Sequence, residues 1–476
     1  MQKRIRVIGG GLAGPEAALQ AAKFGCQVDL YEMRPIRSTE AHQTADFAEL
    51  VCSNSLKSES ENTAPWLLKQ EMRRAGSILL AEADATAVPA GHALAVDRVE
   101  FSKRVAARIA AEPRIKVHRE EVTHLTDSDP QSLDQATITI LASGPLTSPA
   151  LAAELQRLTG SDHLAFYDSI SPIVDATTID MDKVYFAARY DKGTADYINC
   201  PFTKEEYDRF LEALTTAETV PAKDWEKLPE AAGAPGPDSG TWVSTESIKS
   251  TPPQKLQYFE GCLPIEETAR RGRDTLRFGP MKPVGLTDPK TGRWPYACVQ
   301  LRQENLRADS YNLVGFQNHL KFGEQQRVLR RIPGLENAVF LRYGQIHRNT
   351  YIHAPSLLTE TLQLKAHPHI MIAGQLSGVE GYTESIASGM LAGRYAAALA
   401  QGRTPTPAPR ASANGSLTHY ITHSETKKFQ PANITFDLLP PLEEDLRKRI
   451  RDKKERHRIQ CDRALTAWNE WLRHTL

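Results

Sequence analysis

The chain has 476 residues, 41% hydrophobic and 24% charged, which is ordinary for a soluble protein and enough for two or three domains. Lys plus Arg equals Asp plus Glu, 58 residues each, so the composition excludes a global positive field and leaves only local basic patches for binding nucleic acid. No stretch approaches the ~20 uninterrupted apolar residues of a membrane span, and the first strand begins too early for a signal peptide, so we expect no membrane contact.

The first 32 residues predict a strand–helix–strand unit. Residues 5–8 form a short apolar run that is typical of a buried strand, and residues 15–22 form a helical stretch rich in small side chains. Gly25 closes this helix, and residues 28–32 predict a second strand that ends on the carboxylate of Glu32. This order is typical of a nucleotide-binding fold.

A G-x-G-x-x-G turn connects the first strand to the helix. Gly9 makes the tight turn, Gly11 lets the backbone approach a pyrophosphate, and Gly14 lets helix and strand pack closely. The N–H groups at the helix start then face the phosphates, and Glu32 can accept hydrogen bonds from a ribose diol. A glycine-rich turn in an ordinary α/β domain would leave Glu32 unexplained. The predicted cofactor-binding residues of this unit are Gly9, Gly10, Gly11, Leu12, Ala13, Gly14 and Glu32.

The nucleotide fold is resumed far along the chain. A strand at 137–141 runs into a small-residue turn, and a strand at 369–372 runs into Gly374, about 360 residues after Gly14. A helix at 385–399 follows. An enzyme with separate FAD and NAD domains usually carries two glycine fingerprints, whereas this chain carries one. The split therefore favours FAD over NAD at the first site, with Gly374 beside it.

These observations predict an α/β fold, with a Rossmann-like, discontinuous FAD-binding domain and an inserted mixed α+β substrate domain. We expect the FAD-binding domain at 1–160 and 331–442 and the substrate or RNA domain at 161–330, where prolines and aromatics are frequent. A basic helical tail is expected at 443–476. By composition, residues 402–416 are a linker.

Six cysteines are scattered along the chain without C-x-x-C spacing, which argues against a zinc site or a disulfide framework and for a reducing cytoplasm. They are Cys26, Cys52, Cys200, Cys262, Cys298 and Cys461. Two are candidates for catalysis. Cys52 lies in a polar run at 51–58 that we expect to be a loop near the nucleotide turn, and Cys262 precedes an arginine cluster that would lower its pKa. Alternatively, each is a small buried hydrophobic residue.

Three basic runs, at 270–282, 327–331 and 447–458, are candidates for contacts with RNA phosphates. The usual alternative for a charge run is a solvated helix face. Aromatic residues near them, such as Tyr258 and Trp294, could stack on a base or a pterin ring.

Five stretches together resemble one known family, and they are found at 9–14, 31–35, 47–55, 259–266 and 374–382. In particular, Phe-Glu-Gly-Cys-Leu-Pro-Ile-Glu at 259–266 and Gly-Gln-Leu-Ser-Gly-Val-Glu-Gly-Tyr at 374–382 are far more specific than the glycine turn. The family is that of the folate- and FAD-dependent tRNA (uracil-5-)-methyltransferases, related to the wobble-uridine carboxymethylaminomethyl flavoproteins. The resemblance covers nearly the whole chain.

The resemblance implies formation of 5-methyluridine in the T-loop of tRNA. The carbon would come from 5,10-methylenetetrahydrofolate, and the reducing equivalents from NAD(P)H through FAD. By family analogy, Cys262 is the thiolate that adds to uracil C6, and Cys52 is either a base or a thiol near the flavin. The implied partners are tRNA and folate, and the sequence leaves the oligomeric state open.

Three further functions remain open on the sequence. The first keeps the chemistry but acts on a ribosomal-RNA uridine. The second is an NAD(P)H-dependent flavin oxidoreductase of a small molecule, with basic runs that are only solvated. The third is a non-catalytic RNA-binding flavoprotein.

Overall fold

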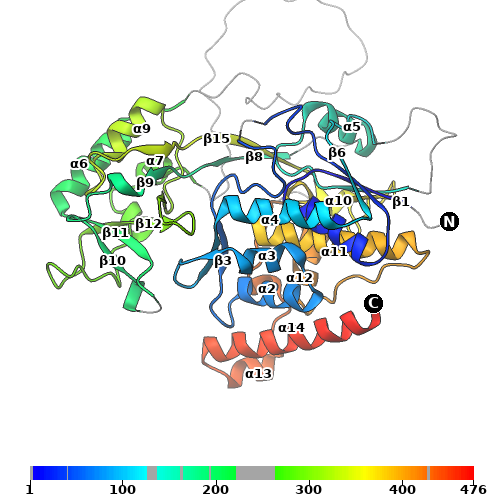
Figure 1. Ribbon diagram of the computed structural model, residues 1–476. Coiled ribbons are helices and arrows are strands. Elements are labelled where there is room, and N and C mark those ends of the chain that lie inside the picture. Colours follow the sequence, from blue (N-terminus) through cyan, green and yellow to red (C-terminus); the bar gives the residue numbers. More distant parts are fainter. Residues whose placement is uncertain are drawn as a thin grey trace, which may run out of the picture.

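The computed structural model describes residues 4–39, 41–125, 137–160, 164–191, 194–220, 263–425 and 429–475. Figure 1 shows two parts side by side, joined by the strands β8 (Leu164–Ser169) and β15 (Ile346–Tyr351). These two strands pair antiparallel along their whole length, so the chain leaves and re-enters the nucleotide-binding part at one place. The expected α/β class, a Rossmann-like domain with an inserted domain of mixed helices and strands, is confirmed.

A five-stranded parallel sheet forms the centre of the larger part, in the order β16-β7-β1-β2-β6. Its strands are β1 (Arg4–Ile8), β2 (Val28–Tyr31), β6 (Ile115–His118), β7 (Thr137–Leu141) and β16 (Ile370–Ile372). In register, Ile5 lies opposite Val28 on one side and Ile138 on the other. All three side chains are buried, as expected for a parallel sheet whose two faces are covered.

Helices α1 (Ala13–Lys23) and α11 (Tyr382–Ala400) pack against each other beside this sheet. The contact is close because small residues face it. A Cβ at Gly389 of α11 would lie 2.3 Å from the carbonyl oxygen of Ala13, so no larger residue fits there without moving α1. The packing fixes the beginning of α1, and thereby the glycine turn, against a helix from the far end of the chain.

Other helices and a small sheet complete the larger part. They are α2 (Ala64–Ala75), α3 (Ile78–Ala85), α4 (Arg98–Ala111), α5 (Pro149–Thr159), α10 (Ala354–Leu357), α12 (Ala413–His423), β3 (Ser55–Ser58), β4 (Ala87–Val88) and β5 (Ala93–Val96). Two expectations were correct only in part here, since residues 51–54 and 402–412 contain no helix or strand but the ends of both segments do. The polar run at 51–58 ends in β3, because its backbone pairs with β5, and the linker expected at 402–416 runs into α12, where Ser412 caps the helix.

The smaller part is built on a six-stranded antiparallel sheet in the order β10-β11-β12-β13-β9-β14. Its elements are β9 (Ile173–Asp175), β10 (Tyr185–Ala187), β11 (Tyr197–Phe202), β12 (Ala297–Gln303), β13 (Ser310–Leu313), β14 (Phe340–Arg342), α6 (Lys204–Thr215), α7 (Ile265–Arg270), α8 (Thr275–Phe278) and α9 (Phe322–Leu329). A second hydrophobic core lies inside it, separate from the core of the larger part. This core begins at Val174, and Phe340 packs against it.

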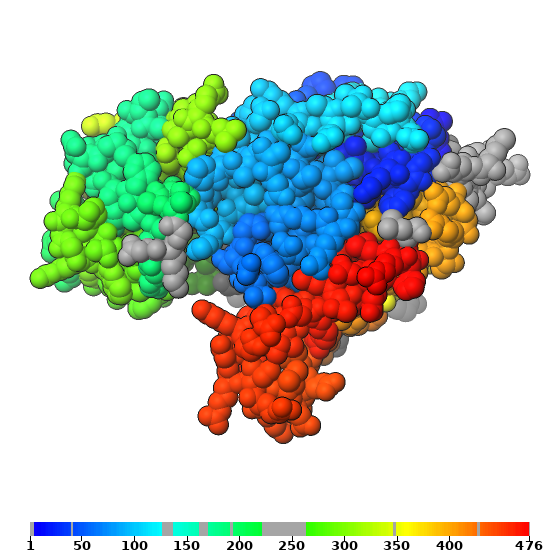
Figure 2. Space-filling view, turned by 60° about the horizontal axis from the view of Figure 1, so that its bottom comes forward, coloured from blue at the N-terminus to red at the C-terminus, as the bar shows by residue number. Residues whose placement is uncertain are grey.

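The chain ends in two helices, α13 (Glu444–Arg449) and α14 (Lys453–Thr475), which Figure 2 shows in orange-red and red on the outside of the blue N-terminal residues. Trp468 of α14 is fully buried, and its indole N–H donates to the carbonyl of Glu71 in α2 at 2.7 Å. The Glu71 carboxylate in turn accepts from the N–H groups of Ala413 and Asn414 at the start of α12. Within the described residues, no helix has both the length and the hydrophobicity needed to cross a membrane.

Candidate functional site: a nucleotide cavity beside a cysteine

A cavity opens where the strands β1, β2, β7 and β16 end, at the carboxyl edge of the parallel sheet. This edge is where open α/β sheets bind their ligands. The space between its walls, including the solvent-filled mouth, is about 1000 Å³. Its walls come from segments far apart in sequence, and the main ones are 8–13, 31–34, 142–148, 374–375 and Tyr382.

The glycine turn forms one wall, and each of its glycines has a distinct environment. Gly9 has φ +115°, and a Cβ there would lie 2.3 Å from the carbonyl oxygen of Ala142. At Gly14, a Cβ would lie 1.8 Å from the carbonyl oxygen of Gly9, so α1 starts directly against the turn. At Gly11, a Cβ would meet no atom of the described chain within 4 Å, although Gly11 lines the cavity. The space in front of Gly11 is therefore available to a ligand.

The beginning of α1 faces the same space. Leu12 is its N-cap residue, and the first N–H groups of the helix receive no side-chain cap from the described residues. Leu12 and Ala13 line the cavity together with Gly10. Uncapped N–H groups at a helix start, at the positive end of the helix dipole, form a site for a phosphate group.

Glu32 lies at the end of β2, is buried, and lines the cavity. Its carboxylate accepts from the N–H of Gly10 at 2.6 Å and from the N–H and Nε of Arg34 at 2.9 and 2.8 Å. Burial acts to raise the pKa of Glu32, but the hydrogen bonds and charge of Arg34, with the N–H of Gly10, outweigh it and hold this pKa below its usual value. Glu32 is therefore an ionised acceptor at neutral pH, as contact with a ribose diol requires.

Gly374 brings the distant segment to the same place. It follows β16 with φ +73°, precedes the short 3₁₀ helix η5 (Gln375–Ser377), and donates its N–H to Ser388 Oγ at 2.8 Å. A Cβ there would lie 3.0 Å from the Cβ of Ala13. The structure thus brings together every cofactor-binding residue expected from the sequence except Gly14, which lies beneath the turn and not in the wall.

Cys52 lies beside this cavity. Within the described chain it is not among the lining residues, but its neighbour Val51 is, and so is Tyr382. The Tyr382 hydroxyl accepts from the N–H of Cys52 at 2.6 Å and from the N–H of Ser53 at 3.3 Å. Sequence reasoning gave Tyr382 no role. The only signal was its place in the Gly-Val-Glu-Gly-Tyr stretch.

Two arginines lie near Cys52, and one of them, Arg98, is paired with Glu304 at 2.5 Å. Arg98 donates to the carbonyls of Leu50 and Cys52 at 2.8 and 3.3 Å, and its guanidinium is within electrostatic range of the Cys52 thiol. Arg342, from β14 of the smaller part, is also within range of this thiol. Positive charges near a thiol favour its thiolate form, which is the nucleophilic one.

The other described cysteines are different. Cys26, Cys200, Cys298 and Cys461 are all buried, whereas Cys52 is half-buried. Burial raises the pKa of Cys298 and of Cys461 to about 12, and that of Cys200 well above its usual value, so these thiols stay protonated at neutral pH. Cys262 lies outside the described residues, and its role stays a prediction.

The three basic runs are not equivalent. Arg270, Arg273 and Arg277 form ion pairs with Glu267, Asp208 and Asp274, and Arg327 pairs with Glu324. In the run at 447–458, Lys448 and Arg458 are paired with acidic residues. Five exposed cations of this run form no ion pair within the part of the chain that the structure describes; they are Arg447, Arg449, Arg451, Lys453 and Lys454.

Known proteins resemble this chain in sequence and in fold. A family model described as Glucose inhibited division protein A matches residues 4–234 and 242–404. The chain is 64% identical over 472 residues to a methylenetetrahydrofolate--tRNA-(uracil-5-)-methyltransferase TrmFO of Koribacter versatilis, covering 99% of this chain and 98% of the relative. It is 58% identical over 480 residues to the protein of that name from Solibacter usitatus, covering all of both. Among solved structures, Aquifex aeolicus GidA has the same fold, with a TM-score of 0.68 and 16% identity over 100% of this chain and 73% of that chain.

Proposed function

The chain belongs to the family described as glucose inhibited division protein A and, within it, to the methylenetetrahydrofolate--tRNA-(uracil-5-)-methyltransferases, and from this membership we propose that it converts a tRNA uridine into 5-methyluridine. The carbon comes from 5,10-methylenetetrahydrofolate, and the reducing equivalents come from NAD(P)H through FAD. The observation that carries the proposal is the match to these methyltransferases from end to end of the chain, together with a nucleotide cavity next to Cys52.

The residues of the cavity fit FAD. The open space in front of Gly11 and the uncapped start of α1 suit the pyrophosphate, and the ionised Glu32 suits the ribose diol of the adenosine. The turns at 142–148 and at Gly374 close the cavity from the other strands. When bound, FAD supplies the redox chemistry that turns a transferred methylene into a methyl group.

We assign the two expected cysteines as follows. Uracil C5 is a poor nucleophile until a thiolate adds at C6, and by family analogy that thiolate is Cys262. C5 then forms its bond to the methylene carbon and gives its proton to a base, and the bond between that carbon and its carrier nitrogen breaks with the electron pair going to the nitrogen. A hydride, which reduced FAD would supply when bound, completes the methyl group, and the sulfur leaves C6 with the electron pair of the S–C bond. Cys52 is the base or a thiol close to the flavin, and the cations Arg98 and Arg342 around it favour its thiolate.

The tRNA needs a basic surface, because phosphate contacts dominate affinity for nucleic acid. We place part of this surface on α13 and the start of α14, where exposed cations are not neutralised by the described acidic residues. In the run at 270–282, Arg270, Arg273 and Arg277 are instead engaged in ion pairs. The target site in the T-loop and the cytoplasmic location are parts of the proposal that follow from the family resemblance.

The domain organisation is also part of the proposal. We divide the chain into a discontinuous FAD-binding domain, 1–160 and 331–442, an inserted domain, 161–330, and a basic tail, 443–476. The two separate hydrophobic cores support an inserted domain. Since Phe340 packs against the second core and β14 extends its sheet, we move the end of the insert from residue 330 to near residue 342, and the FAD-binding domain resumes after it.

The test is to incubate unmodified tRNA with the protein, methylenetetrahydrofolate and NADPH, and to look for 5-methyluridine by nucleoside mass spectrometry. Mapping of 5-methyluridine in RNA from cells that lack this protein separates tRNA from ribosomal RNA as the target. Oxidation of NADH at full rate without RNA, with no methylated nucleoside, would instead support a small-molecule oxidoreductase.

A further inference from the structure

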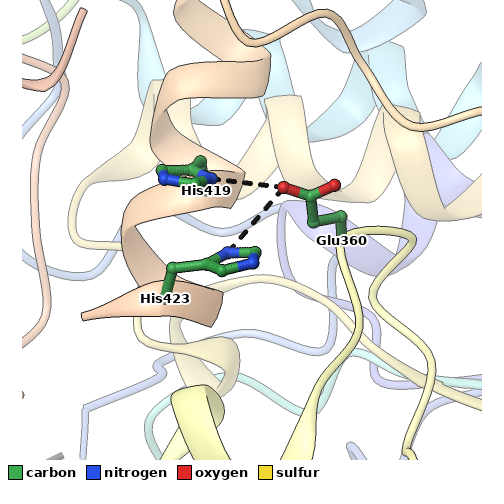
Figure 3. Close-up of side chains that lie close together, drawn as sticks. All are labelled: Glu360, His419 and His423. Carbon is green, nitrogen blue, oxygen red and sulfur yellow. Dashed lines mark hydrogen bonds and ion pairs between the residues drawn. The ribbon is translucent and has the colours of Figure 1, made fainter. Parts of the chain in front are cut away.

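Three potential metal ligands converge at the end of α12, outside the nucleotide cavity. They are Glu360, in the loop after α10, and His419 and His423, on the last turns of α12. Figure 3 shows both imidazole rings turned towards one carboxylate oxygen of Glu360. It is the one group of three or more His, Cys, Asp or Glu side chains, within the described residues, whose ligand atoms all lie within 4.8 Å of one another.

The spacing of the ligand atoms suits a small cation. Glu360 Oε1 lies 3.2 Å from His419 Nδ1 and 3.7 Å from His423 Nδ1. Two metal–ligand bonds of about 2.0 to 2.1 Å at a tetrahedral angle place their ligand atoms about 3.3 Å apart. The two histidines are four positions apart on one helix, so they face the same side, and their rings stack at 4.2 Å. Small side-chain rotations therefore bring all three atoms to one ion.

We propose that Glu360, His419 and His423 form a binding site for a divalent transition-metal ion of the zinc class. Two imidazoles and one carboxylate are a ligand set that Zn²⁺ accepts, with water as the fourth ligand. Imidazole does not suit Mg²⁺ or Ca²⁺, which prefer oxygen ligands, and there is no thiolate here to select Cu⁺. The cysteine spacing gave no reason to expect a metal, and this site uses no cysteine.

The surroundings favour a cation in two ways. His419 and His423 lie at the carboxyl end of α12, where the helix dipole is negative. All three side chains are also accessible, with exposed fractions of 42% for Glu360, 37% for His419 and 50% for His423, so an ion can enter with a bound water. Two groups act against binding of a cation. Arg410 is a positive charge within electrostatic range of Glu360. Thr422 Oγ1 lies 2.9 Å from His423 Nδ1, and this contact is lost when the nitrogen binds metal.

The ion would connect the end of α12 to the loop after α10. The start of α12 is already fixed, because its first N–H groups donate to the buried carboxylate of Glu71. A metal at the other end would fix the helix at both termini. Because it binds the folded arrangement and not the unfolded chain, it would stabilise the protein according to its free concentration.

The experiment titrates zinc sulfate into the untagged, full-length flavoprotein by calorimetry and follows the melting temperature with and without the ion. We expect saturable binding to the wild type, with weakening of about tenfold or more in Glu360→Gln and His423→Ala, since even changes around a metal ligand typically cost 10- to 100-fold. Zinc should raise the melting temperature of the wild type more than that of Glu360→Gln. Glu360→Gln keeps the size of the side chain, so it stays informative if His423→Ala does not fold.

The matched control is His367→Ala. His367 and His369 form another pair of neighbouring imidazoles, 6.0 Å apart, which belongs to no group of three potential ligands within the described residues. This variant should bind zinc as the wild type does. The proposal is overturned if the wild type shows no saturable binding, or if Glu360→Gln and His423→Ala bind as tightly as it does, because the zinc is then held elsewhere, for example by thiols.

Discussion

The hydroxyl of Tyr382 accepts a hydrogen bond from the backbone N–H of Cys52 at 2.6 Å, although the two residues are 330 positions apart. Tyr382 begins α11, and α11 packs on α1, which carries the glycine turn at its start. Tyr382 lines the nucleotide cavity and also binds the backbone of Cys52. It therefore fixes the position of Cys52 relative to the cavity. The same hydroxyl also accepts from the N–H of Ser53.

Replacement of this tyrosine tests the relationship. Tyr382→Phe removes the acceptor and leaves the N–H groups of Cys52 and Ser53 without it. We expect the rate of methylation to fall by roughly tenfold, because the loss of such a hydrogen bond costs about 1 to 1.5 kcal/mol, while bound flavin is retained. Tyr420→Phe, which removes a hydroxyl that donates to the Gln430 carbonyl at 3.0 Å, is the control and should methylate normally. An unchanged rate in Tyr382→Phe would show that this contact does not position Cys52 for the reaction.

The placement of FAD is tested at Gly11. A side chain there would point into open space in the cavity, so Gly11→Leu should fold normally and purify colourless. The control is Gly323→Leu in α9, where a Cβ also meets no described atom within 4 Å, and this variant should stay yellow. Circular dichroism verifies the fold and visible absorbance measures the flavin. A fully loaded Gly11→Leu protein would contradict the placement.

Glu71 predicts a pH dependence of stability. Burial raises the pKa of Glu71 to about 7, although the hydrogen bonds that its carboxylate accepts from the N–H groups of Ala413 and Asn414 act to lower it. In the unfolded chain, with a pKa of about 4.5, Glu71 loses its proton first as pH rises, so the folded state binds more protons between these values. The contribution of Glu71 is therefore complete below about pH 4.5 and falls by about 3 kcal/mol as pH rises to about 7.

The measurement is urea unfolding across this pH window for the wild type and Glu71→Gln. The amide cannot ionise but still accepts one hydrogen bond. We expect the free energy of unfolding of the wild type, relative to that of the variant, to decrease as pH rises. Parallel profiles for the two proteins would mean that Glu71 does not titrate in this range.

The basic tail should contribute to tRNA binding through charge. Replacing Arg447, Arg449 and Arg451 with serine should weaken binding and lower the slope of log affinity against log salt, by about 0.7 to 0.9 per lost phosphate contact. Arg273→Ser is the control, because this guanidinium already pairs with Asp208. An equal loss of tRNA affinity in both proteins, or no loss in the triple variant, would mean that the RNA-binding surface does not lie on α13.

The local parts of the site could be predicted from sequence. The turn from Gly9 to Gly14, the strands on either side of it and the carboxylate of Glu32 lie within one short unit, and their spacing determines their geometry. The return of the chain at Gly374 was visible as a second strand ending in a glycine. In each case the backbone conformation, such as the φ of +115° at Gly9, requires a particular residue type, and that residue can be recognised in the sequence.

The contacts between distant segments could not be predicted. Nothing near Cys52 indicates that Tyr382 holds it, and nothing near Arg273 indicates that Asp208 neutralises it. The end of the expected linker became α12 because Glu71, from another helix, satisfies its first N–H groups. These pairings depend on how distant segments pack in three dimensions, and the order of residue types along the chain gives little information about that packing.

The most direct test of the proposed function follows the transferred carbon. The flavin-loaded protein is incubated with unmodified tRNA, NADPH and methylenetetrahydrofolate that is deuterated on its methylene carbon, and the nucleosides are analysed by mass spectrometry. We expect 5-methyluridine that carries the deuterium from the wild type and from Cys461→Ala, and none from Cys262→Ala, which should remain yellow. Unlabelled or absent 5-methyluridine from the wild type, or a full yield from Cys262→Ala, would contradict the account.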